Sequence, residues 1–287
     1  MKKNTFLFII IVLISSISYG QATASSATAT ALATQMAGPG ITITNPVITV
    51  GTTVLGAAAT STQAGTFSNG IAGASLQLDS GIALTTSDIT TAFSANTNTS
   101  SVNHDGGTTY TDAELTALGV TNSINDLIIF EFDAVLDPLA TVLTIDYQFM
   151  SDEYNQYVCS DFNDVFGYFI TSDLTAPHTG YQNLALVPGT SNPVTIAAIN
   201  NGSFGTNGSL DNCVDLTQSA QFIDNPVGTP PVFMEFNGMT KKLRASAKNL
   251  VPGTTYHVKL VIADIGDTAF DSAILINLIS GFPDDDD

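Results

Sequence analysis

The sequence predicts an all-β fold with minor α content: an antiparallel, jelly-roll-like β-sandwich that forms a single domain with one short helix and long loops. Many short segments alternate apolar and polar residues, which is the pattern of strands with one buried and one solvated face. Polar stretches rich in Gly, Asn and Thr separate them, as is common in sandwiches and jelly rolls. Because single sandwiches often exceed ~200 residues, the chain of 287 residues needs no second domain.

Residues 41–50 give the first strand pattern, in which apolar residues alternate with Thr around a break at Asn45-Pro46. The strongest strand patterns lie in residues 127–134, 141–150, 165–170, 255–264 and 272–279. Weaker strand patterns lie in residues 74–78, 81–85, 183–189 and 193–200. The Asn237-Gly238 dipeptide predicts a hairpin within residues 232–248.

One helix is predicted, with Thr111 as its N-cap, Glu114 completing a capping box and Gly119 ending it. Residues 21–35 are rich in Ala, Ser and Thr and lack aromatic residues, so we expect a flexible lead-in there. The β domain is expected over residues 36–283, followed by an acidic tail at 284–287.

The N-terminus has the pattern of a secretory signal peptide over residues 1–20. Lys2 and Lys3 precede an apolar run, and small residues lead to Gly20, after which cleavage is expected. The apolar run is too short for a comfortable transmembrane helix, although an uncleaved anchor is the alternative. No later segment is apolar and long enough to span a bilayer. We therefore expect a secreted or surface protein with no transmembrane segment in the mature chain.

The charge distribution limits the partners. The chain has 26 acidic and seven basic residues, and between Gln21 and Thr240 there is no Lys or Arg. Phosphate contacts need Lys and Arg, so nucleic acid is excluded as a partner, and an anionic membrane surface is disfavoured for the same reason. The Asp excess has two interpretations: turn formation, or Ca²⁺ binding through clustered oxygen ligands.

Two acidic clusters lie at predicted strand ends, one around residues 152–164 and one around residues 264–271. They supply six candidate Ca²⁺ ligands: Asp152, Glu153, Asn163, Asp164, Asp264 and Asp271. A carboxylate that close to an apolar core needs hydrogen-bond donors or a cation, and the first cluster has no basic residue near it in sequence. Neither cluster matches an EF-hand. Hydrogen bonds to loop backbone N–H groups, or a catalytic carboxylate pair, are the alternatives.

Cys159 and Cys213 are the two cysteines. In an exported protein an isolated pair is usually a disulfide, and closing a loop of about 54 residues contributes about 4 kcal/mol in the chain-entropy model. Two buried free thiols are the alternative. Other catalytic patterns are weak, because the sequence contains no G-x-S-x-G motif and its three His lack zinc-ligand spacing.

Several long segments together resemble the choice-of-anchor L domain of exported bacterial proteins. They run in order from GPGITITNP through YQFMSDEYNQYVCSDFNDVFGYFI and NLALVPGTSNPVTI to NGMTKKLRASAKNLVPGTTYHVKLVIADIGDTAFDSAILI. The resemblance covers nearly all of residues 36–282. It implies a secreted or surface-displayed bacterial protein with varied C-terminal anchors, and it carries no catalytic activity over to this chain.

This sequence departs from the family pattern in two places. It ends at PDDDD without a recognisable anchor, as expected of a fragment or a freely released form. Similar domains often have a Cys where this chain has Gly253, which leaves Cys159 and Cys213 as the pair that the resemblance implies.

We therefore expect a non-catalytic, Ca²⁺-stabilised binding or adhesion module at the bacterial surface. Its partner would be an extracellular glycan, the matrix or another surface protein. A glycan-processing enzyme with paired carboxylates and a purely structural extracellular spacer are the rival hypotheses.

Overall fold

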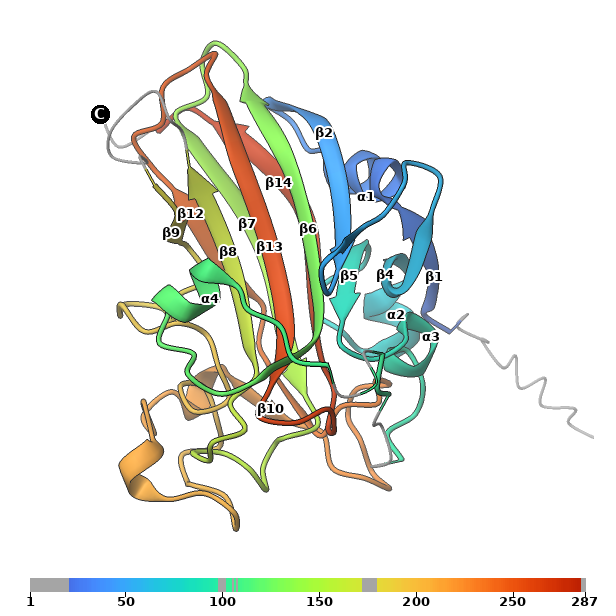
Figure 1. The fold of residues 1–287 in the computed structure, drawn as a ribbon, viewed down its shortest axis with the longest axis vertical. Helices are drawn as coiled ribbons and strands as arrows, with labels where there is room; N and C mark the ends of the chain where they lie inside the picture. Colours follow the sequence, from blue (N-terminus) through green and yellow to red (C-terminus); the bar gives the residue numbers. More distant parts are fainter. Residues whose placement is uncertain (1–20, 98–101, 105, 107, 172–179, 285–287) are drawn as a thin grey trace, which may run out of the picture.

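A computed structural model describes residues 21–97, 102–104, 106, 108–171 and 180–284. The predicted signal peptide and most of the predicted acidic tail lie outside these residues. Figure 1 shows two β-sheets packed face to face, with loops gathered at one end. All strand pairs between named strands are antiparallel. The predicted all-β sandwich is confirmed.

The larger sheet has the order β1-β4-β5-β14-β7-β11-β10, and β12 also pairs with β7. Its strands are β1 (Thr23–Thr28), β4 (Thr60–Ser68), β5 (Gly81–Thr85), β7 (Val142–Ser151), β10 (Phe222–Asp224), β11 (Gly238–Thr240), β12 (Leu243–Ala247) and β14 (Ser272–Phe282). The smaller sheet has the order β3-β2-β6-β13-β8-β9. Its strands are β2 (Ile41–Val50), β3 (Thr53–Val54), β6 (Ile124–Leu136), β8 (Val165–Thr171), β9 (Gln182–Asn183) and β13 (Thr255–Ile265).

The main core lies between the two sheets. Alternate residues of β6 and β7 point into it, among them Phe130, Phe132, Tyr147 and Phe149, all fully buried. A second apolar cluster covers the outer face of β6, β8 and β13, where Leu115 of α4 (Ala113–Ala117) packs over these strands. Where this second cluster covers β6, β8 and β13, both faces of these strands are therefore apolar.

The expected flexible lead-in is instead ordered and packed. Residues 21–35 contribute all of β1 and most of α1 (Ala29–Met36). Strand β1 pairs with β4 at the sheet edge, and α1 buries Leu32 and Met36 completely. The expectation was wrong because two apolar side chains one turn apart, flanked by small residues, are enough to seat a short helix on a sheet.

The described residues contain four α-helices rather than one. Besides α1 and α4 these are α2 (Gly70–Ala74) and α3 (Ile89–Ala92), and two short 3₁₀ helices are η1 (Leu210–Asn212) and η2 (Ser219–Gln221). The predicted helix is α4, but its N-cap is Asp112, which accepts a hydrogen bond from the Leu115 N–H, and not Thr111.

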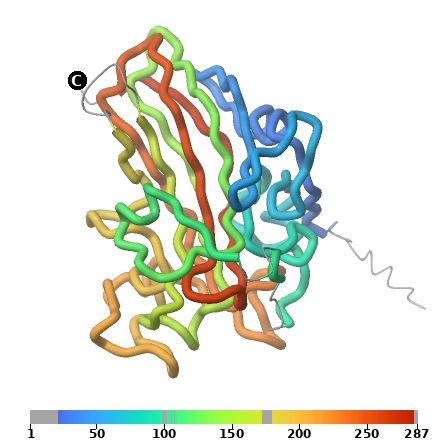
Figure 2. Tube along the Cα trace, in the orientation of Figure 1, coloured from blue at the N-terminus to red at the C-terminus, as the bar shows by residue number. Residues whose placement is uncertain are grey.

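Some weaker strand predictions were wrong. Asn237-Gly238 does not turn a hairpin, because β11 and β12 both run along β7 and residues 231–237 form bends. Residues 74–78 form no strand, and residues 184–200 carry only isolated bridges. The long loops that remain lie together at the lower end of the molecule in Figure 2.

Two basic residues of β13 in the smaller sheet, Lys259 and His257, each contact two acidic residues. Lys259 of β13 is 6% exposed and contacts Asp112 at 2.5 Å and Glu114 at 2.6 Å, which fixes α4 to the sheet. His257 lies 2.9 Å from Asp133 and 3.4 Å from Glu131. The hydrogen bond with Glu131, opposed by partial burial and supported by Asp133, raises the pKa of His257 to about 8.

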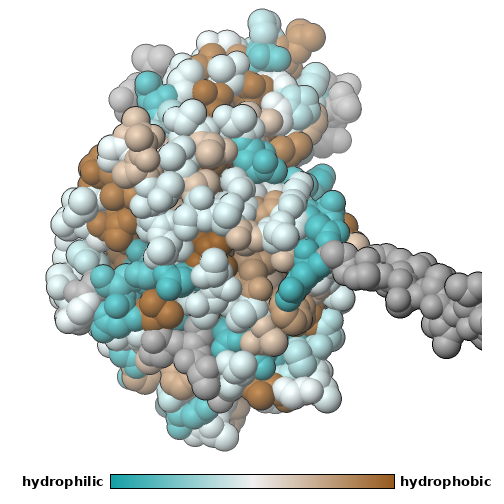
Figure 3. Space-filling view, turned by 90° about the vertical axis from the view of Figure 1, so that its right-hand side faces the viewer, coloured by the Kyte–Doolittle hydropathy of each residue, from teal (hydrophilic) through white to brown (hydrophobic). Residues whose placement is uncertain are grey.

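The face formed by the N-terminal strands and helices carries interspersed hydrophilic and hydrophobic residues (Figure 3). Its exposed apolar side chains include Val54 on β3 and Ile71 on α2, which belong to separate elements. Exposed apolar residues scattered in this way are normal for a soluble domain, so this face gives no indication of a ligand.

Candidate functional site

Six acidic residues lie together at the loop-rich end of the sandwich, and we call them the acidic cluster. They are Asp126, Asp152, Glu153, Asp164, Asp264 and Asp271, and each is at most 2% exposed. The smaller sheet supplies three of them, from β6, the start of β8 and the end of β13. The other three follow β7 or precede β14 in the larger sheet.

The register of the strands explains why residues distant in sequence meet here. Ser151 at the end of β7 pairs with Ser272 at the start of β14, so Asp152 and Asp271 lie next to each other, and the Asp152 N–H donates to the Asp271 carbonyl at 3.0 Å. In the other sheet Asp264 pairs with Asn125, beside Asp126. Antiparallel pairing therefore brings six carboxyl groups to one end.

Several of these carboxylates accept hydrogen bonds. Asp164 accepts from the Ile265 N–H at 3.0 Å and from the Ser272 hydroxyl at 2.6 Å, and so it joins β13 to β14. Asp152 accepts from the Asn237 N–H at 3.1 Å. The backbone N–H groups of residues 102 and 104 donate to Asp271 and Asp126 respectively.

Four buried carboxylate oxygens have no hydrogen-bond partner among the described residues. They are both oxygens of Asp264, Oδ2 of Asp152 and Oε2 of Glu153. The Thr86 hydroxyl lies close enough to Asp264 to lower the pKa of its carboxyl group, but the hydrogen bonds of good geometry that this hydroxyl makes are with Ser272. Buried carboxylate oxygens without donors are costly, so these atoms are the feature of the cluster that requires an explanation.

Burial raises the pKa of four carboxyl groups in the cluster, and neighbouring carboxylates raise it further. These groups are Asp152, Glu153, Asp164 and Asp264. The pKa of Asp164 rises to about 7, with the hydrogen bonds from Ser272 and Ile265 opposing the effect of burial. No Lys or Arg contributes to any of the four shifts.

The basic side chains that form ion pairs in the described part of the chain pair with acids outside the cluster. Lys242 and Arg244 contact Asp146, Lys248 contacts Asp284, and Lys259 contacts α4. Within the described residues, no three His, Cys, Asp or Glu side chains are already arranged as a metal-binding group. Asp152, Glu153, Asp164 and Asp264 thus lie in a buried acidic region, and none of these ion pairs between described residues includes them.

The family model of the Choice-of-anchor L domain matches residues 21–281. The chain belongs to the Choice-of-anchor L domain family. No curated protein and no solved structure matches the chain. Membership of this family indicates an exported or surface-associated bacterial protein, and no helix in the part of the chain described is long and apolar enough to cross a membrane.

Five of the six predicted site residues of this Choice-of-anchor L domain meet in the cluster, and the sixth does not. Asn163 faces the other way, where its Oδ1 accepts a hydrogen bond from the Ala197 N–H at 3.1 Å. Asp126 was missed, although a polar Asn-Asp pair beside an apolar strand was a usable signal. Glu235, also missed, is 2% exposed and raises the pKa of Asp152.

The two cysteines of the Choice-of-anchor L domain are joined. Cys159 and Cys213 form a disulfide with a Cα–Cα separation of 4.5 Å, so the alternative of two free thiols was wrong. Cys159 is buried in the main core. The bond ties the loop containing η1 to the segment that connects β7 and β8.

Proposed function

We propose that this chain is a non-catalytic binding or adhesion module, secreted or held at the cell surface, whose acidic cluster binds Ca²⁺. The observation that carries the proposal is the set of four buried carboxylate oxygens without partners in the described chain. A glycan, the extracellular matrix or another surface protein is the expected partner.

The case for a cation rests on electrostatic cost. Moving an ionised carboxylate out of water costs several kcal/mol even after relaxation, and here six carboxyl groups share one buried region. Protonation is one way to remove the charge and a bound cation is the other. A divalent cation neutralises two carboxylates at once and also bonds to their free oxygens, which protonation of single groups does not achieve.

Ca²⁺ fits the donor set better than other common metals. It takes six to eight oxygen ligands in flexible geometry, including backbone carbonyls, whereas Mg²⁺ needs near-octahedral coordination. The cluster offers oxygen and neither thiolate nor imidazole, which disfavours zinc. The unpartnered oxygens of Asp152, Glu153 and Asp264 would be the first ligands, with Asp126 and Asp271 beside them.

The glycan-processing alternative is less well supported. A raised carboxyl pKa is expected of a general acid, and Glu153 has one. A glycosidase pair must, however, reach the bond between two sugars. At 1–2% exposure, Glu153 and its neighbour Asp152 are closed to such a substrate, so the same carboxylates suit an internal cation better.

Thermal unfolding of the predicted mature chain, residues 21–287, tests the cation. Ca²⁺ at a hundred times its Kd adds about 2.7 kcal/mol, and for a chain of this size the midpoint should rise by about 5–10 °C relative to EDTA. Mg²⁺ should give a smaller rise. Equal midpoints in Ca²⁺ and EDTA would refute Ca²⁺ binding.

Binding is tested separately, by applying the same protein to a glycan array and to matrix-coated plates. The proposal expects retention on one of these surfaces in the presence of Ca²⁺. A protein that unfolds normally with Ca²⁺ but is retained by neither surface would leave a structural spacer as the function.

A further inference from the structure

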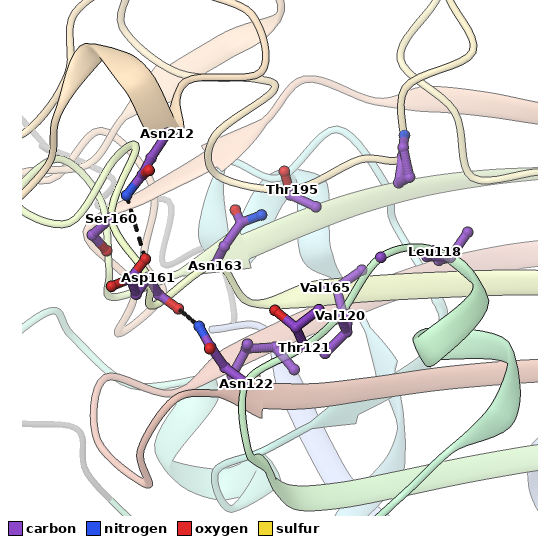
Figure 4. A pocket seen from close by; sticks show the side chains of 13 residues that line it. Leu118, Val120, Thr121, Asn122, Ser160, Asp161, Asn163, Val165, Thr195 and Asn212 are labelled. Carbon is purple, nitrogen blue, oxygen red and sulfur yellow. Dashed lines mark hydrogen bonds between the residues drawn. The ribbon is translucent and has the colours of Figure 1, made fainter.

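A pocket of about 250 Å³ lies beside the acidic cluster, on the outer side of the smaller sheet. The segment after α4, the start of β8 and the loop containing η1 surround it (Figure 4). Its polar lining residues are Thr121, Asn122, Ser160, Asp161, Asn163, Thr195 and Asn212.

The lining combines an apolar floor with a polar rim. Val165 and Ile265 are buried, while Leu118 and Val120 complete the apolar side. The rim carries amides, hydroxyls and one carboxylate, Asp161, and the described lining contains no Lys, Arg, His or aromatic residue. The described lining therefore offers no positive charge to an anion and no aromatic ring on which a flat aromatic ligand could stack. The lining therefore suits a neutral molecule with several hydroxyl groups.

The size of the pocket narrows the ligand to one ring. Drug-sized ligands occupy pockets of roughly 300–1,000 Å³, and this pocket is smaller. A single sugar residue offers hydroxyl groups that donate and accept hydrogen bonds, and C–H faces that pack on aliphatic side chains. Amide side chains and one carboxylate match both hydrogen-bonding roles of such hydroxyls.

A buried hydroxyl in the pocket has no partner within the described chain. Thr195 is 7% exposed, and its Oγ1 makes no hydrogen bond with the described residues. Figure 4 shows Asn163 beside Thr195 on the same side of the pocket. The Oδ1 of Asn163 already accepts from the Ala197 N–H, so its Nδ2 is the group left to donate to a ligand.

The rim is held in place before any ligand arrives. The Asn122 amide donates to the Asp161 carbonyl at 2.8 Å, and the Asn212 amide donates to the Asp161 carboxylate at 3.3 Å (Figure 4). The Cys159–Cys213 disulfide joins the two rim segments, because Cys159 precedes Ser160 and Cys213 follows Asn212. A pocket whose walls are already fixed loses less entropy on binding.

We propose that this pocket binds one neutral sugar residue of an extracellular glycan. The inference deepens the proposed binding function and rests on it, but it does not depend on Ca²⁺. Because the ligand is small and polar, a free monosaccharide should bind with a Kd of about 1 mM. Acidic sugars should bind much more weakly, since Asp161 repels them and no cation in the described lining attracts them.

Saturation-transfer NMR of the mature chain with glucose, galactose, mannose and N-acetylglucosamine tests the proposal, with glucuronic acid and inorganic phosphate as anionic probes. At least one neutral sugar should receive saturation, and neither anion should. Thr195→Val and Asn212→Ala should each weaken the binding by about 3- to 10-fold. Asn207→Ala, an exposed change outside the pocket, is the control.

Thr195→Val separates binding from folding, because it removes a hydroxyl that has no described partner and should leave the unfolding midpoint unchanged or higher. Saturation of no neutral sugar, equal saturation of an anion, or sugar binding unchanged in both pocket variants would overturn the inference. If glycans on the array are retained while these results fail, the pocket assignment is wrong and the binding function stands.

Discussion

Replacing Asp264 by Asn removes one charge from the acidic cluster while keeping the shape of the side chain. Burial, and then the charges of Asp164 and Asp271, raise the pKa of Asp264 well above its ordinary value. Between the unfolded and the folded pKa of Asp264, the folded chain without metal therefore holds a proton that the unfolded chain has lost. Its stability falls as pH rises from the unfolded pKa, near 3.9, toward the folded pKa.

The size of this effect follows from the pH difference. Each pH unit between the unfolded and the folded pKa costs about 1.4 kcal/mol, so at pH 7, about 3 pH units above the unfolded pKa, the penalty is at most about 4 kcal/mol. Asn carries no such penalty, and its amide donates to acceptors in a region rich in carboxylates. In EDTA, Asp264→Asn should therefore raise the free energy of unfolding by up to about 4 kcal/mol, or the midpoint by about 8–16 °C.

In excess Ca²⁺ the advantage of the variant should shrink by up to about 2.7 kcal/mol, because the variant lacks a ligand and gains less from the cation. Thermal unfolding at pH 7, in EDTA and in Ca²⁺, measures both effects. Asp137→Asn, in the exposed turn after β6, is the matched control and should stay within about 0.5 kcal/mol of the original chain. If Asp264→Asn lowers the midpoint equally in both conditions, the charge on Asp264 is not the source of the strain and the reasoning fails.

Three further predictions concern other parts of the fold. Replacing Cys159 and Cys213 by Ala should lower the free energy of unfolding, measured in urea, by about 4 kcal/mol for a sequence separation of 54. Reductant should lower the free energy of unfolding of the original chain by the same amount. The raised pKa of His257 contributes stability that is complete below pH ~6.5 and is lost as pH rises through about 8; His257→Gln should flatten this part of the midpoint–pH curve. Lys259→Met should lower the free energy of unfolding by about 3–5 kcal/mol, because it leaves the buried Asp112 and the partly buried Glu114 without their cation. Lys248→Met, at a half-exposed pair, should change this free energy little.

The long strands could be predicted from sequence because apolar and polar residues that alternate over many positions fit only a strand with one buried face. In β6, Ile128, Phe130 and Phe132 lie on one face as expected, with Glu131 and Asp133 on the other. The lead-in could not be predicted, since α1 depends on a pocket that other strands create for Leu32 and Met36.

The Asn237-Gly238 dipeptide misled for a related reason. The same pair that turns hairpins elsewhere here connects a bent loop to β11, and the Asn237 backbone and side chain both bind Asp152. Tertiary hydrogen bonds decided the conformation, and these are not visible in a local pattern.

The candidate site was predictable in part because carboxylates at strand ends converge when the strands are antiparallel neighbours. Asp152 and Asp271 meet for this reason, as do Asp164 and Asp264. Asn163 could not join them, because successive residues of an extended segment point to opposite sides. Applied to the segment before β8, that rule would have excluded Asn163 from the sequence alone.

The same alternation links the acidic cluster to the pocket. At the start of β8, Asp164 points inward to the cluster, while Asn163 and Val165 line the pocket. At the end of β13, Asp264 belongs to the cluster and Ile265 lines the pocket. The Ile265 N–H donates to Asp164, so one hydrogen bond holds both strand ends together. A cation bound in the cluster would contact these strand ends on the side opposite to the pocket. Any coupling between the two proposed sites would therefore pass through this hydrogen bond, and by linkage it would have the same size in both directions. The pocket itself is already formed without the cation, so such coupling would adjust sugar binding rather than create it.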